Sequence, residues 1–146
     1  MEMKKRRGWA LFARVIQNKD ESEGLGKMAC LTGNIDNVND YLNAIDIIVM
    51  PSLFEGVPLT LIEQQANGLH CLVADTITRE TDKTGNLKFL SLKVPVEEWA
   101  ETVMCEDGVC REERSKKAVE NVIKAGYNIK EQAKKLVSFY REAIVK

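Results

Sequence analysis

The chain has 146 residues, the length of one domain. Hydrophobic residues make up 45% and charged residues 29%, a composition that excludes a disordered or fibrous protein. A formal net charge of -1 argues against nucleic acid or a membrane surface as a partner, because binding to either usually requires a basic surface. The longest largely apolar stretches, such as residues 44–50, which include Asp46, are shorter than the ~18 residues of a membrane span.

The cysteines give no metal-binding spacing. Cys30, Cys71, Cys105 and Cys110 form no CxxC pair, and the chain has one histidine, so no metal site is expected. Cys30 and Cys71 fall in apolar segments typical of buried strands. Free core thiols in a reducing cytosol are therefore favoured over disulfides.

The first half of the chain alternates helices and strands. Residues 1–27 predict a helix followed by a polar loop, and residues 28–33 a short buried strand. Residues 38–45 have helical spacing of apolar side chains, with Asp36 as the expected N-cap. The segment 46–50, apolar after Asp46, stops at a proline and predicts a parallel strand buried on both faces.

The second half continues the alternation and ends in helices. A helix opened by Pro58 and closed by Gly68 precedes two strands, at 71–75 and 87–92. Three helical segments follow. The last is capped by Asn128 and carries Ala133, Leu136, Val137, Tyr140 and Ile144 on one side.

This order predicts an α/β protein: a partial Rossmann-like parallel sheet with flanking helices and a helical C-terminal tail. About four strands are readable, fewer than the five or six of a complete open sheet.

The loop after residue 50 is the predicted ligand site, since ligands of parallel sheets bind beyond the carboxyl ends of the strands. The helix that begins near Pro58 has first N–H groups without intrahelical partners, and such helix starts attract phosphates. The expected donors are the N–H groups of Gly56, Val57, Leu59 and Thr60.

Two glutamates flank these donors, Glu55 in the loop and Glu63 on the second turn of the helix. Carboxylates accept hydrogen bonds from paired hydroxyl groups, which sugars and riboses supply. A sugar–diphosphate–ribose ligand would therefore suit the pair. From these residues alone, a purely structural role for the glutamates stays open as an alternative. Glutamate in the first turns of a helix interacts favourably with the helix dipole without binding any ligand.

Residues 46–69, DIIVMPSLFEGVPLTLIEQQANGL, resemble the donor-site signature of retaining glycosyltransferases of family 4, which have the two-Rossmann GT-B architecture. The hallmark of that family, E-x7-E, corresponds to Glu55 and Glu63. Flanking segments extend the resemblance to about residues 28–143. The similarity is strongest to enzymes that make bacterial capsular polysaccharides or exopolysaccharides.

The resemblance implies transfer of a hexosyl group from a nucleotide sugar, a UDP-sugar, to a polysaccharide or glycolipid acceptor. Glu55 would be the catalytic residue near the donor sugar, and Glu63 would bind the nucleotide ribose. Gly56, Val57 and Pro58 would line the sugar, and Leu59 and Thr60 would face the diphosphate. No metal or other cofactor is implied. A cytoplasmic location is expected, with association with the inner face of the membrane as a second expectation.

The sequence departs from the family in two ways. His70 replaces a proline that usually follows the helix, and is expected to be a surface turn residue. No segment corresponds to the acceptor-binding N-terminal domain or to the Arg and Lys that hold the diphosphate.

These departures predict that residues 28–146 form a truncated nucleotide-sugar-binding domain, half of a GT-B fold, preceded by an atypical segment 1–27. Such a chain would be a C-terminal fragment, inactive without the missing N-terminal domain or a homodimer partner. The alternatives are a non-catalytic truncated paralogue, or a docking subunit that self-associates through an exposed sheet edge. A sugar epimerase with two Rossmann domains is a further alternative.

Overall fold

The structure, a computed structural model, describes residues 30, 32–104 and 110–144. The chain divides into two compact units, Met1–Val38 and Asn39–Lys146. The sheet and the helices that cover it belong to the second unit.

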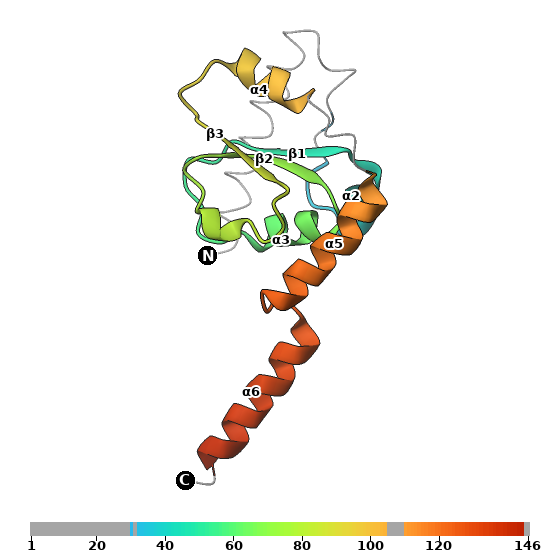
Figure 1. Ribbon diagram of the computed structural model, residues 1–146, viewed down its shortest axis with the longest axis vertical. Helices are drawn as coiled ribbons and strands as arrows, with labels where there is room; N and C mark the ends of the chain where they lie inside the picture. The colour runs from blue at the N-terminus through green and yellow to red at the C-terminus, as the bar shows by residue number, and fades with distance from the viewer. Residues whose placement is uncertain (1–29, 31, 105–109, 145–146) are drawn as a thin grey trace. The chain divides into compact units, whose positions relative to one another are not determined.

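Three parallel strands form the sheet of the described residues, in the order β1-β2-β3 (Figure 1). They are β1 (Ile47–Met50), β2 (His70–Ala74) and β3 (Leu87–Leu90). Ile47 pairs with His70, and Cys71 pairs with Leu87. The parallel pairing confirms the predicted α/β class and its partial Rossmann-like sheet.

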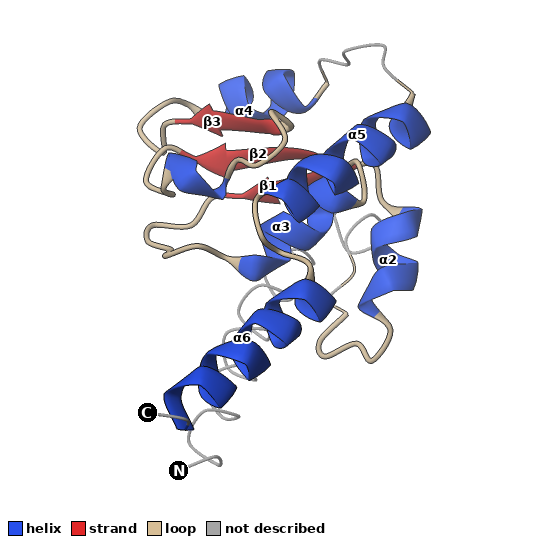
Figure 2. Ribbon diagram, turned by 60° about the horizontal axis from the view of Figure 1, so that its bottom comes forward, coloured by secondary structure: helices blue, strands red, loops and turns tan. Residues whose placement is uncertain are grey.

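Helices lie on both faces of this sheet. Helix α3 (Leu59–Ala66) lies on one face with α5 (Arg111–Lys124) beside it, and α4 (Val96–Val103) lies on the other (Figure 2). Helix α2 (Val38–Ala44) precedes β1, the short helix η1 (Arg79–Thr81) follows β2, and α6 (Ile129–Ile144) comes last. The helices predicted over 38–45, after Pro58 and in the C-terminal third are thus confirmed.

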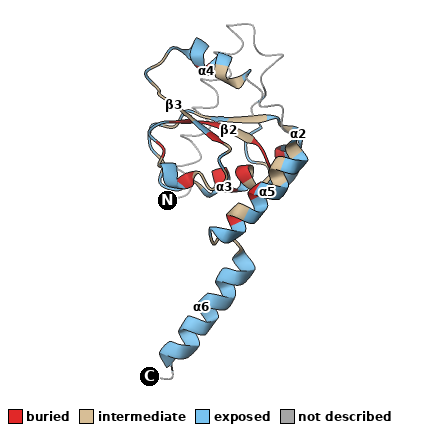
Figure 3. Ribbon diagram, in the orientation of Figure 1, coloured by how far each residue is buried: buried red, intermediate tan, exposed pale blue. Residues whose placement is uncertain are grey.

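Strand β2 supplies the centre of the core to both faces. Cys71 and Val73 pack with Leu61 of α3, whereas Leu72 and Ala74 pack with Trp99 of α4. This alternation follows from the period of two in a strand. Figure 3 shows the resulting concentration of buried residues along β2 and α3.

The predicted burial of β1 on both faces is wrong. Ile48 and Met50 pack against the cluster beneath α3, but Val49 is 46% exposed. Within the described sheet β1 is an edge strand, and α4 sits over β2 and β3 instead. The apolar sequence of β1 therefore reflects two things: one face is covered, and isoleucine and valine favour strands.

The predicted strand at 28–33 is not found in its described part. Cys30 is exposed, and neither Thr32 nor Gly33 is in a strand. Gly33 has φ of +62°, a left-handed conformation that interrupts extended backbone. Cys71 is a free, buried thiol as predicted. Cys30 is also a free thiol, but the prediction that it is buried is wrong. The predictions for residues 1–27 and for Cys105 lie outside the described residues.

Candidate functional site

The loop between β1 and α3 lies at the carboxyl edge of the sheet and is fixed to the neighbouring loop there. The Thr76 hydroxyl, two residues beyond β2, donates a 2.7 Å hydrogen bond to the carbonyl of Ser52. At the same edge the N–H of Asp75 donates to the Leu90 carbonyl at 2.9 Å. Two loops that follow adjacent strands are thus joined where parallel sheets bind ligands.

Helix α3 begins at this edge with open N–H groups. Pro58 occupies the N-cap position with extended backbone, and no side chain caps the helix among the described residues. The N–H of Leu61 donates to the Pro58 carbonyl at 3.0 Å. Helix geometry leaves the N–H groups of Leu59 and Thr60 without intrahelical acceptors, and both residues are exposed. An anion can therefore reach this helix start.

The two glutamates lie on either side of that start along the chain. Glu55 is half-buried in the loop, and Glu63 is exposed on α3. Glu63 lies one turn beyond Leu59, a rise of about 6 Å along the axis. The roles of Glu55 and Glu63 in ligand binding remain predictions.

Gly56 and its neighbours leave the loop accessible. A Cβ placed on Gly56 would meet nothing within 4 Å, so the protein's own packing does not require glycine there. Val57 is 39% exposed, and the preceding Leu53 and Phe54 are 82% and 85% exposed. The space beside Gly56 is therefore open to a ligand, bordered by apolar side chains.

Sequence reasoning missed the structural role of Gln65. This fully buried amide donates from Nε2 to the carbonyls of Leu61 (3.0 Å) and Thr81 (2.9 Å). Its Oε1 accepts from the N–H of Lys83 (2.9 Å) and the hydroxyl of Thr84 (3.0 Å). Gln65 thus holds residues 81–84 against the helix that carries Glu63. A glutamine on the otherwise apolar face of a helix was the available signal.

Thr76 was also missed, although it lies two residues beyond a strand at the ligand edge. His70, by contrast, is not a turn residue. It is the first residue of β2, half-buried, and its ring contacts Arg114 of α5. The amino end of β2 lies opposite the carboxyl edge, so His70 is not brought to Glu55.

The described residues do not offer a metal site, since no group of three or more His, Cys, Asp or Glu side chains gathers among them. None of their helices is both long and apolar enough to cross a bilayer.

The family model of the glycosyl transferases group 1 matches residues 11–105, about two thirds of the chain. The chain belongs to this glycosyltransferase family. The matched range contains Glu55, Glu63 and all three strands of the described sheet. It begins within the predicted N-terminal segment 1–27, and it ends before α5.

Two relatives add detail. EpsF of Bacillus subtilis (strain 168), which carries the name of a glycosyltransferase, is 31% identical over 126 residues, covering 86% of this chain and 33% of EpsF. The UDP-Gal:alpha-D-GlcNAc-diphosphoundecaprenol alpha-1,3-galactosyltransferase of Escherichia coli is 38% identical over 58 residues, 40% of this chain and 15% of that enzyme. The chain thus spans a third or less of the length of these relatives. No solved structure matches it.

Proposed function

We propose that this chain binds the nucleotide-sugar donor of a retaining glycosyltransferase that transfers a hexosyl group to a polysaccharide or glycolipid acceptor. One observation carries the proposal. In a member of a glycosyltransferase family, an uncapped helix start at the carboxyl edge of a parallel sheet is flanked by Glu55 and Glu63.

The start of α3 would hold the donor diphosphate. The N–H groups of Leu59 and Thr60 point out of the helix start, and those of Gly56 and Val57 precede them along the loop. The positive end of the helix dipole adds to these donors. Pro58 has no N–H and therefore adds no donor to this set.

The carboxylates would bind the hydroxyl groups at the two ends of the ligand. Glu63, one turn into α3, would accept hydrogen bonds from the ribose hydroxyls. Glu55, in the loop, would act on the donor sugar as the catalytic carboxylate. Because each carboxylate lies beyond the amide donors, its negative charge is kept away from the phosphates. The two carboxylates would also fix the orientation of the bound ligand, with the sugar near Glu55 and the ribose near Glu63.

The name of the E. coli relative supports a UDP-sugar donor and a lipid-linked acceptor. An acceptor in the membrane would bring the protein to its inner face from the cytoplasm. We propose residues 28–146 as the donor-binding domain. Transfer would then require an acceptor-binding domain as well, because the chain spans only 33% of EpsF. A truncated paralogue or docking subunit that self-associates is the second candidate, and the position of β1 at the edge of the described sheet favours it.

Isothermal titration calorimetry with UDP, a UDP-sugar and a GDP-sugar tests the proposal. We expect saturable binding of UDP that Glu63→Gln weakens about 10- to 100-fold, the loss typical of one hydrogen bond to a charged group. Glu55→Gln should leave UDP affinity unchanged and weaken only the UDP-sugar. Glu120→Gln, an exposed glutamate on α5, is the matched control.

The proposal is wrong if the wild-type chain binds none of these nucleotides. A stable dimer without nucleotide affinity would favour the docking subunit.

A further inference from the structure

The β1–α3 loop, residues 51–57, carries Glu55 but has few contacts of its own. None of its residues is buried. Within the part of the chain that the structure describes, one hydrogen bond joins residues 52–57 to another segment, and it runs from the hydroxyl of Thr76 to the carbonyl of Ser52 at 2.7 Å. Segments with so few contacts open easily, so the order of this loop depends on that bond.

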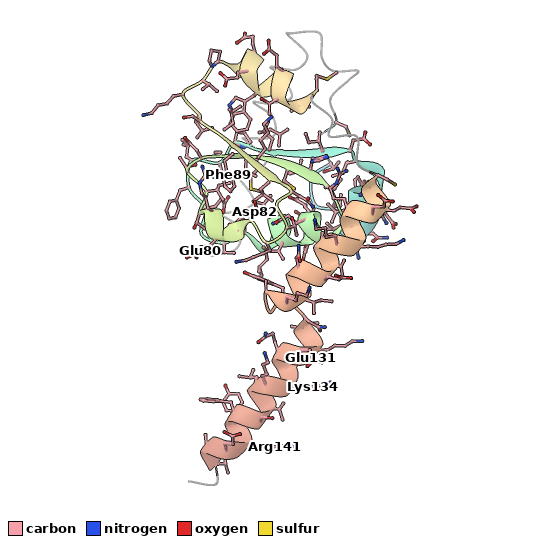
Figure 4. All side chains as sticks on the ribbon, viewed as in Figure 1. Glu80, Asp82, Phe89, Glu131, Lys134 and Arg141 are labelled. Carbon is pink, nitrogen blue, oxygen red and sulfur yellow. The ribbon has the colours of Figure 1, made fainter. Side chains whose placement is uncertain are left out.

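Thr76, by contrast, belongs to a segment that is packed firmly against the sheet. The next residue, Ile77, is 1% exposed and lies in the core beneath α3. In η1, the guanidinium of Arg79 lies over the ring of Phe89 of β3, with Cζ 4.5 Å from the ring centroid. Figure 4 shows Phe89 together with Glu80, the residue that follows Arg79. The hydroxyl of Thr76 is therefore held by a rigid support.

The same segment is also bonded to the helix that carries Glu63. The carbonyl of Thr81 accepts a 2.9 Å hydrogen bond from Nε2 of Gln65, which is fully buried on α3 two residues beyond Glu63. Residues 76–81 thus form a brace, bonded at one end to the helix of Glu63 and at the other to the loop of Glu55. The brace gives the two glutamates a second connection, in addition to the loop itself.

We propose that Thr76 is a positioning residue of the donor site, whose hydroxyl orders the β1–α3 loop before the nucleotide sugar binds. The ordered loop fixes the N–H groups of Gly56 and Val57 relative to the start of α3. It also fixes the carboxylate of Glu55 relative to Glu63. A loop that is ordered in advance loses less conformational entropy on binding, so the ligand binds more tightly. The identity of the ligand rests on the proposed function, whereas the order of the free loop does not.

The variants Thr76→Val and Thr76→Ser test this inference, because valine keeps the shape of threonine without its hydroxyl and serine keeps the hydroxyl. NMR relaxation of the backbone amides gives the order parameters of residues 53–57. We expect values near about 0.85 for the wild type and Thr76→Ser, and below about 0.6 for Thr76→Val. Urea denaturation should give similar stabilities for the three proteins, since Thr76 is exposed.

Calorimetric titration with UDP tests the role in binding, because its diphosphate would meet the N–H groups of the loop. We expect Thr76→Val to weaken UDP binding about 3- to 10-fold, the loss typical of one hydrogen bond, and Thr76→Ser to retain the wild-type affinity. Ser52→Ala is the matched control. The bond uses the backbone carbonyl of Ser52 and not its side chain, so both the order parameters and the affinity should stay as in the wild type.

The inference alone is overturned if the wild type binds UDP and Thr76→Val changes neither the order parameters nor the affinity. A loop that loses its order in Thr76→Val without any loss of UDP affinity also overturns the assigned role. A wild-type chain that does not bind UDP contradicts the proposed function instead, and the order parameters then decide whether Thr76 fixes the loop.

Discussion

Gln65 shows how one buried polar residue can position a loop. Its amide binds four partners on α3 and residues 81–84, so its removal leaves backbone groups in the core without hydrogen bonds. Buried groups that lose their partners cost about 1–3 kcal/mol each.

We expect Gln65→Leu to lower the free energy of unfolding by about 2–4 kcal/mol, although the shape of the side chain is nearly kept. Urea denaturation measures the change. Gln64→Leu is the control, because the buried Oε1 of Gln64 has no hydrogen-bond partner among the described residues. Equal losses from both variants would contradict the assigned role of Gln65.

Cys71 should make stability depend on pH in the alkaline range. Burial, and then the negative charge of Asp82, raise the pKa of this thiol from 9.0 to about 12. Between those values the unfolded chain has lost the proton while the folded chain keeps it. The unfolded state then binds fewer protons, so stability falls as pH rises.

The contribution of this thiol is fully present below pH 9.0 and is lost as pH rises through about 12, at most on the order of 1 kcal/mol per pH unit. Urea denaturation across this range should give a steeper decline for the wild type than for Cys71→Ala. Parallel curves would mean that the thiol titrates normally in the folded protein.

At the scale of elements, the first turn of α5 binds the ends of two other helices. The guanidinium of Arg111 donates to the carbonyls of Leu42 (2.5 Å) and Ile45 (2.9 Å) at the end of α2, and to the carbonyl of Asn67 (3.3 Å) after α3. The hydroxyl of Ser115 donates to the Ala66 carbonyl at 2.9 Å. Arginine charge at helix C-termini also favours the helix dipoles.

Gly68 permits this contact between α5 and the end of α3. Its φ is +78°, and a Cβ there would lie 2.8 Å from the Arg111 carbonyl oxygen and 2.8 Å from the Ser115 nitrogen. Gly85 has nearly the same φ, +80°, but its Cβ would meet nothing within 4 Å. Comparing substitutions at the two glycines therefore distinguishes the cost of backbone strain from the cost of close packing.

We expect Gly85→Ala to cost about 1 kcal/mol, the strain of a left-handed residue. Gly68→Ala should cost about 1–3 kcal/mol more, because α5 must move away. Thermal denaturation of the two variants measures the difference. Similar melting temperatures would show that α5 is not held closely at Gly68.

Across the whole molecule, charge is nearly balanced, while among the described residues apolar side chains are exposed at several places, residues 53–54 and α6 included. The sequence has a pI near 5.9. Proteins near zero net charge lose the repulsion that keeps exposed apolar faces apart.

Turbidity should therefore be highest near pH 5.9 and fall on either side. Leu136→Asp should reduce the maximum more than Ser138→Asp, although both lower the pI equally. A solubility that changes steadily through this pH range would contradict the expectation.

The sequence by itself determined the order of the strands and α-helices from α2 onward, the parallel class and the family. Pro58, Gly68 and Asn128 act locally: proline and glycine fix backbone angles, and the side chain of Asn128 accepts from the N–H of Lys130 at 3.1 Å. The spacing of Glu55 and Glu63 is likewise readable without a structure.

Only the tertiary structure decided which surfaces are covered. It left Val49 exposed at the edge of the described sheet, joined Thr76 to Ser52, and gave Gln65 partners 16 to 19 residues away. It also left α6 exposed, although its periodicity equals that of a packed helix. Hydrophobic periodicity shows that one face of a helix is apolar. Whether that face is buried depends on contacts with segments distant in the sequence, and a local pattern does not specify those contacts.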